Sequence, residues 1–406
     1  MGPVLLALAV VIFAARVGGW AAVRIGQPRV VGEILAGVVI GPSALGLLGG
    51  VVTTDRLFPA EVRSALGVIG QLGLLMFMLL VGVVFEPADV GRRWPAVGVV
   101  AVTVVAVPVG LGFALSPVLD SDRFSTGASA TAFALFLGAM LSVSAFPVTV
   151  RILEELRLER STLGVVAIAA AAVVTVLMFI VSATARAVAD GADAGGLVAV
   201  PVRAVAYLGI MLLVVRPALR VVGDRIAGLP TGGGLAVVAV VTLVSGRLAV
   251  EADLGVIVGG FIAGVVLPRR DVLAPVVIAR TSDLVATILL PVFLATSGLI
   301  TDLTSVGVGS LPGIAVFLVA AVVAKLAVGW AVARAVGLAD HEARILGALM
   351  NCRGLLVLVI GMTAVEAGVI TAQMQVGSVL VALVTTAMTG PIVNRSLAAS
   401  TPVSVR

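Results

Sequence analysis

A lone lysine lies in the middle of an apolar stretch of this chain. Lys325 is fourteen residues into the run 311–333 and is the only lysine among 406 residues. An ionisable side chain deep in an apolar helix costs on the order of 3 kcal/mol or more and usually has a function. Lysine can release its proton, whereas arginine cannot. We therefore predict that the function needs an amine at position 325 that can lose its proton; the alternative is a lysine whose ammonium group reaches the membrane surface.

Polar residues interrupt two of the apolar segments. One interruption is Asn351-Cys352-Arg353-Gly354, and the other runs from Ser142 to Thr149, where Pro147 deletes a backbone donor. Broken helices expose carbonyl groups and half-helix dipoles that can hold an ion. An ordinary kink is the alternative for Pro147. The candidate residues of an ion or substrate pathway are Ser144, Pro147, Thr149, Val174, Thr175, Lys325, Asn351 and Arg353.

Few other side chains could do chemistry. Glu33 and Glu366 are possible supporting acids, with structural acids near the membrane interface as the alternative. Cys352 is the only cysteine, which excludes a disulfide framework and a cysteine metal site. The sequence carries no nucleotide loop, metal-ligand cluster, paired nucleophile and base, or basic run. We expect no catalytic residue, no metal, no cofactor, no enzymatic activity and no nucleic-acid partner.

The elements that position these residues must be helices in a lipid bilayer. The chain is 61% hydrophobic and 12% charged, with a mean hydropathy of +1.25, which excludes a soluble globular protein. We predict an all-α polytopic membrane protein with a single transmembrane domain over 1–398 and a short cytoplasmic tail over 399–406. About thirteen helices are expected, at 3–23, 30–48, 64–84, 95–118, 127–150, 162–185, 197–215, 232–250, 254–268, 284–300, 311–333, 345–365 and 373–394.

The arginines indicate the orientation of these helices. Seventeen arginines fall in loops after odd-numbered helices or at the C-terminus, and six fall on the opposite side. Cytoplasmic loops collect arginine and lysine. We therefore predict an integral cell-membrane protein with its N-terminus outside and its C-terminus in the cytoplasm.

Two segments of the chain resemble each other. VGEILAGVVIGP (31–42) and VGGFIAGVVLPR (258–269) match at six of twelve positions, and GLLMFMLLVG (73–82) and LLPVFLATSG (289–298) follow in the same order. The predicted topology gives the copies opposite directions. We predict two inverted five-helix repeats, at about 30–186 and 254–396, with crossed discontinuous helices, as in many secondary transporters. Chance similarity between apolar helices is the alternative.

Seven stretches resemble one known family. They are GQPRVVGEILAGVVIGPSALG (26–46), GQLGLLMFMLLVGV (70–83), SVSAFPVTVRILEELRLERSTLG (142–164), LGVIVGGFIAGVVLPR (254–269), LLPVFLATSGLITDL (289–303), LGALMNCRGLLVLVI (346–360) and ALVTTAMTGPIV (382–393). They resemble the monovalent cation:proton antiporters, in the branch that includes Kef-like and plant cation/proton exchanger membrane domains. The resemblance implies a sodium/proton antiporter-like fold, a homodimer, and exchange of a monovalent cation for protons by alternating access.

The chain departs from this family at its ion-binding motif. The family carries A-A-x-(D/N)-D on the helix after the first break, and this chain has Val174 and Thr175 at the two polar positions. Val84 likewise stands where an acid is usual. A hydroxyl cannot titrate near neutral pH. Lys325 and Arg353 resemble the family's core cations, so we expect either an uncharged lysine or an anion between the helices.

Three functions are consistent with this sequence. The first is a sodium- or potassium-for-proton antiporter in which Lys325 or another group takes over proton coupling. The second keeps the fold and moves an anionic or amphipathic small molecule. The third is a non-transporting relative with a degenerate site.

Overall fold

The computed structural model describes residues 2–44, 57–85, 90–227, 232–268, 273–299, 307–354 and 356–400. Within these ranges, eleven helices are long and apolar enough to cross a membrane. Two shorter helices, α2 (Arg29–Ile40) and α13 (Gly255–Val266), complete thirteen consecutive rods. The predicted all-helical class and the count of thirteen are confirmed. The tail 399–406 lies largely outside the described residues.

The rods of the first half are α1 (Gly2–Arg24), α2, α4 (Ala60–Val84), η1 with α6 (Gly91–Arg93, Trp94–Leu119), α7 with α8 (Ala130–Ser142, Phe146–Glu155) and α9 (Thr162–Ala189). A long rod follows, made of α10 (Ala194–Gly209), η2 (Ile210–Val215) and α11 (Arg216–Ala227). Those of the second half are α12 (Gly233–Glu251), α13, α14 with η3 and α15 (Leu273–Leu284, Val285–Leu289, Leu290–Leu299), η5 with α16 (Val308–Ser310, Leu311–Ala335), α17 with α18 (Asp340–Asn351, Leu356–Glu366) and α19 (Ala372–Ser400).

Polar caps set the start of several helices. Ser129, Ser161 and Asp193 each accept a hydrogen bond from a backbone N–H of the first turn of α7, α9 and α10, at 3.2, 3.0 and 2.8 Å. Such side chains satisfy amides that the helix itself leaves unpaired. The three caps fix where these helices begin next to the loops.

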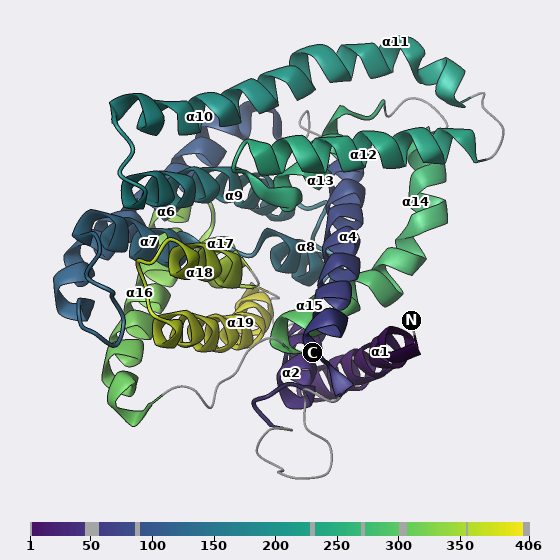
Figure 1. The fold of residues 1–406 in the computed structure, drawn as a ribbon. Helices are drawn as coiled ribbons and strands as arrows, with labels where there is room; N and C mark the ends of the chain where they lie inside the picture. The colour runs from purple at the N-terminus through teal and green to yellow at the C-terminus, as the bar shows by residue number, and fades with distance from the viewer. Residues whose placement is uncertain are drawn as a thin grey trace, which may run out of the picture.

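The rods pack as two bundles. We call α6–α9 and α16–α19 the core bundle, and α1, α2, α4 and α12–α15 the panel bundle. Helices contact each other extensively within each bundle, whereas contacts between the bundles, such as α4 with α8 and α9 with α13, are few. The rod α10–α11 runs along the edge of the molecule, beside α12 (Figure 1). This division leaves a long seam between the bundles.

Glycine contacts relate the two halves of the chain. Gly37 and Gly264 occupy the same position in the two similar segments, and a Cβ at either would collide with a backbone carbonyl of a facing helix, Ala295 O or Leu79 O. Gly82 and Gly298 face Phe261 O and Ile34 O in the same way. Small residues allow such close approach of helices in membranes. The pair α2–α15 and the pair α4–α13 therefore pack by the same glycine-to-carbonyl contacts, and each pair joins one helix of the first half to one of the second half.

Two helices are longer than hydropathy predicts. The helix expected at 197–215 extends to Ala227, so Arg216 lies within a helix and not in a loop. The helix expected at 284–300 begins earlier, at Leu273, so Arg280 also lies within a helix. Hydropathy detects only the apolar part of a rod, and charged turns continue it. Both rods contain a π-helical turn, η2 or η3, that ends two residues before Pro217 or Pro291. Proline removes a backbone donor, which favours such a local rearrangement.

Candidate functional site

The two predicted interruptions meet in the core bundle. Residues 143–145 separate α7 from α8, and 352–354 separate α17 from α18. The backbone N–H of Ala145 donates to the carbonyl of Cys352 at 2.8 Å. Pro147 lies in the first turn of α8, where its missing N–H leaves no unpaired amide. The broken helices therefore cross at their breaks, and we call this place the crossing.

Hydroxyl groups from the first break bind the end of α17. Ser144 Oγ donates to Met350 O at 2.7 Å, and Thr149 Oγ1 donates to Leu349 O at 3.3 Å. All four residues are buried. The last carbonyls of a helix have no partner within it. Neutral side chains of one broken helix thus satisfy the backbone of the other.

Lys325 reaches the crossing from α16 and is fully buried. Its Nζ donates to Ser142 O at 2.6 Å, to Val104 O at 3.0 Å and to Ser144 Oγ at 3.0 Å. The Ser144 hydroxyl proton already points at Met350 O, so Ser144 Oγ accepts from the lysine. An ammonium group has three donors and no acceptor. These three oxygens match all the donors of a charged lysine.

Arg353 binds the same end of α7 from the second break. Its Nη2 donates to Leu141 O at 2.8 Å and to Ala321 O at 3.1 Å, and its Nη1 donates to Met140 O. The C-terminal end of a helix carries partial negative charge. Carbonyl groups therefore bind both buried basic side chains, and the uncharged lysine or intervening anion expected from the sequence stays a prediction.

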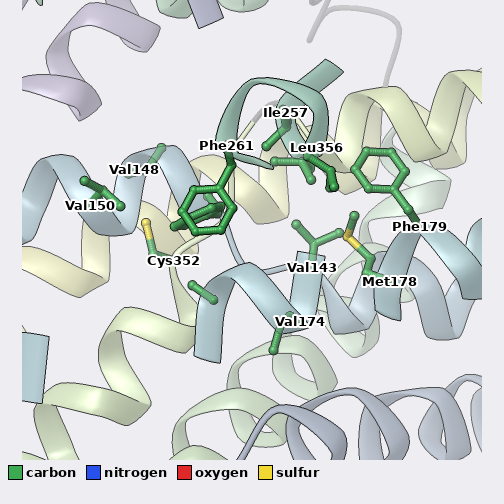
Figure 2. Packing of buried hydrophobic residues seen from close by; sticks show 14 of the residues in the cluster. Val143, Val148, Val150, Val174, Met178, Phe179, Ile257, Phe261, Cys352 and Leu356 are labelled. Carbon is green, nitrogen blue, oxygen red and sulfur yellow. The ribbon is translucent and has the colours of Figure 1, made fainter. Parts of the chain in front are cut away.

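Val174 and Thr175 lie in α9 without forming a polar site. Both are fully buried, and Thr175 Oγ1 donates to Ala171 O at 2.8 Å within its own helix. Figure 2 shows Val174 in an apolar cluster with Val143 of the first break and Phe261 of α13. The family's acid position is thus occupied by a packed valine and a back-bonded hydroxyl.

A cavity opens at the seam between the bundles. It measures about 680 Å³ and is lined by α4, α8, α9 and α14 with η3. Its walls are mostly apolar, and Val84, where an acid is usual in the family, is one of them. Four lining side chains are charged: Arg93, Glu154, Glu159 and Arg160.

An aromatic contact lies between this cavity and the crossing. The Phe261 ring of the panel bundle packs edge-on against Phe146, the first residue of α8, with centroids 5.0 Å apart. It also lies 5.4 Å from Phe85, which lines the cavity. Phe261 thus connects Phe85 of the cavity wall to Phe146 next to the crossing.

The two possible supporting acids have different surroundings. Glu33 is 3% exposed and packs beside Gly19 of α1, so its side chain is buried between helices. Glu366 ends α18 and forms a 3.8 Å ion pair with Arg186, with its side chain 63% exposed. Among the described residues, no group of three or more His, Cys, Asp or Glu side chains could hold a metal ion.

The sequence reasoning missed Thr386 of α19. Its Oγ1 accepts from the Arg353 N–H at 3.2 Å and contacts the Arg353 carbonyl, so it holds the backbone of the second break. The signal was present as three buried threonines, Thr385, Thr386 and Thr389, in an apolar segment. Hydroxyl groups inside a membrane usually bond to a carbonyl or to a neighbouring helix.

Comparisons with known proteins cover nearly the whole chain. The family model described as "Sodium/hydrogen exchanger, transmembrane" matches residues 10–398. The Na(+)/H(+) antiporter NhaS4 of Synechocystis is 33% identical over 96% of both chains. Cation/H(+) antiporter 20 of Arabidopsis thaliana is 32% identical over 90% of this chain, and K(+)/H(+) antiporter 1 of Saccharomyces cerevisiae is 29% identical over 90%. The chain spans less than half of these last two relatives, 45% and 43%.

A solved structure has the same fold. The sodium proton antiporter MjNhaP1 from Methanocaldococcus jannaschii, determined at pH 8, aligns with a TM-score of 0.68, covering 98% of this chain and 97% of that one. The two sequences are 14% identical, so this likeness concerns the fold alone.

Proposed function

The chain belongs to the sodium/hydrogen exchanger family, and from that premise we propose that it exchanges a monovalent cation, sodium or potassium, for protons across the membrane, with Lys325 as the proton carrier. The observation that carries the proposal is the set of three neutral oxygens around Lys325 Nζ at the crossing. No catalytic residue, metal or cofactor is assigned.

The same oxygens can serve a proton-bearing amine or a cation. Oxygen ligands suit hard cations, and the oxygens of Val104, Ser142 and Ser144 are all neutral. When Lys325 releases its proton, one positive charge leaves the crossing, and a cation that enters restores it. In the family motif the proton and the cation compete for a carboxylate, which Val174 and Thr175 cannot supply because neither side chain ionises. Here the protonated Lys325 and the cation would instead compete for these three neutral oxygens.

We further propose an orientation and an assembly. The cavity opens near the loop 156–161, which the arginine distribution places in the cytoplasm, with the N-terminus outside and the C-terminus inside. Alternating access then consists of the core bundle moving against the panel bundle along the sparsely packed seam. The family resemblance supports a homodimer in the cell membrane. Reciprocal glycine contacts support the two repeats at about 30–186 and 254–396.

A flux measurement tests the exchange. We expect purified protein in liposomes to acidify or alkalinise the lumen when sodium or potassium is added, and Lys325→Met to lose this response. The matched control is Arg247→Met, at an exposed ion pair on α12, which should retain it. Absence of any response to sodium, potassium and lithium in the parent protein contradicts the proposal.

The cavity favours a second candidate function. Its mostly apolar walls, with two arginines and two glutamates at the charged positions, suit an amphipathic small molecule whose anionic group Arg93 and Arg160 would bind better than a bare cation. In that case Arg93→Ala together with Arg160→Ala should abolish transport, whereas cation exchange should be reduced only slightly. A chain with neither activity is the non-transporting relative.

Thiol labelling tests the orientation. A cysteine introduced by Arg160→Cys should react with an impermeant reagent only from the cytoplasmic side, and one introduced by Ser121→Cys only from outside. Both positions are exposed, whereas the native Cys352 is buried. Labelling of the first variant in intact cells contradicts the proposed orientation.

A further inference from the structure

One carboxamide in the core bundle has no partner. Asn351, the last residue of α17, is fully buried, and neither its Oδ1 nor its Nδ2 makes a hydrogen bond to any residue that the structure describes. A buried amide without partners is unfavourable, and such a group in a folded protein commonly marks a place where a ligand or water binds. Within the described part of the chain Asn351 therefore lacks a partner, which a bound ligand or water would supply.

Backbone contacts place Asn351 close to Lys325. Gly347 of α17 lies directly on Gly329 of α16, and these helices run in opposite directions. One turn further along α17 is Asn351, and one turn back along α16 is Lys325, so both lie at the same level. Met350, the residue before Asn351, accepts the Ser144 hydroxyl to which Lys325 donates.

Lys325 does not use Asn351 in this structure, because its three donors already bind Val104 O, Ser142 O and Ser144 Oγ. Of the helices packed on α16, α6 and α7 carry no charged residue, and Arg353 at the second break is the charged group that acts on Lys325. The remaining titratable residues of α17 and α19 lie near the inner ends of those helices: Asp340, His341, Glu342, Arg344 and Arg395. The free amide oxygen is thus available close to a lysine whose charge can change.

We propose that Asn351 Oδ1 is a side-chain ligand of the transported monovalent cation, which binds at the crossing once Lys325 has released its proton. The inference rests on the proposed exchange function and assigns it a ligand. A dehydrated monovalent cation takes neutral oxygens from carbonyl and hydroxyl groups. Asn351 Oδ1 adds one more such oxygen to those that bind Lys325, on a chain that lacks the family's carboxylate.

The test compares cation binding in three proteins. Unfolding temperature in detergent is measured with and without sodium or potassium, and the apparent KM for the cation is measured in liposomes. We expect Asn351→Leu to lose the cation-induced rise in unfolding temperature and to raise KM by about tenfold or more, the scale of one lost bond to a charged group. The matched control is Thr296→Val on α15, which removes a buried polar group, a hydroxyl, that likewise has no partner among the described residues. It should behave like the parent protein.

A second variant covers the case in which Asn351→Leu fails to fold. Asn351→Asp keeps the shape and adds a charged oxygen, so it should lower KM for the cation by about tenfold. Parent-like KM and parent-like cation stabilisation in either folded variant overturn the role of Asn351 and leave the exchange function intact. Absence of any cation effect in the parent protein overturns the exchange function itself.

Discussion

Restoring a carboxylate at Thr175 tests where the ion site of this antiporter lies. Thr175 is fully buried, and its hydroxyl donates only within α9, to Ala171 O. α9 packs on α6 and α7, whose carbonyls bind Lys325. We expect Thr175→Asp to bring a carboxylate close enough to Lys325 for the two to form an ion pair.

The size of the effect follows from the contacts. The lost hydrogen bond costs about 1 kcal/mol. A buried carboxylate without a partner costs several kcal/mol more, which attraction to Lys325 offsets. We expect Thr175→Asp to reduce the free energy of unfolding by about 1–3 kcal/mol and to show a favourable coupling of about 1–3 kcal/mol with Lys325 in a double-mutant cycle.

The assay combines stability with flux. Unfolding is measured in detergent for Thr175→Asp, Lys325→Met and the double variant, and cation-dependent proton flux in liposomes should rise in Thr175→Asp. The matched control is Thr184→Asp, because Thr184 also lies in α9 and also donates to the carbonyl four residues earlier, at 2.8 Å. A coupling energy near zero, or equal flux in Thr175→Asp and Thr184→Asp, refutes the reasoning.

Three further outcomes are expected. Lys325→Arg should fold but show no cation-driven proton flux in liposomes, because arginine keeps its proton; full activity moves the proton carrier elsewhere. Gly82→Ala should lower the free energy of unfolding by about 1–3 kcal/mol, because its Cβ meets a backbone carbonyl, whereas Gly67→Ala on the same helix α4 has open space and should be neutral or slightly stabilising. Arg353→Met should lower the free energy of unfolding by about 3 kcal/mol or more, because three buried carbonyls lose their donor. The control Arg186→Met removes only exposed ion pairs and should lower it by less than about 1 kcal/mol.

The arrangement of helices was readable from the sequence because it depends on periodic and repeated features. Thirteen apolar runs predicted thirteen rods, and Pro147 and the Asn351–Gly354 segment marked both breaks. The starts of α14 and α17 differ from the predicted ones, because Arg280 and Asp283 within α14 and the charged first turn of α17 lower the local hydropathy. Hydropathy detects the apolar part of a helix, which lies in the hydrocarbon core of the membrane. The bounds of the helix are instead set by its backbone hydrogen bonds, which continue through charged turns.

The surroundings of the two buried cations could not be read from the sequence. The resemblance marks Lys325 and Arg353 as core cations, and the missing acid predicts an uncharged lysine or an anion between the helices. Most of their partners are main-chain carbonyls, and carbonyls leave no mark in a sequence because every residue has one. The partners are supplied by the fold, through a helix that stops at Ser142 and turns its last carbonyls toward both cations.

The binding of both cations by neutral groups has a consequence for the driving force of exchange. Of Lys325, Arg353, Val174 and Thr175, only Lys325 can gain or lose a proton at ordinary pH. If Lys325 releases one proton for each cation bound, every cycle moves one positive charge in each direction and no net charge crosses the bilayer. Membrane voltage then does no work on the cycle, and the concentration gradients of the proton and of the cation alone set its direction. Sodium-for-proton exchange measured in liposomes should be unchanged when a potassium ionophore clamps the voltage at different values.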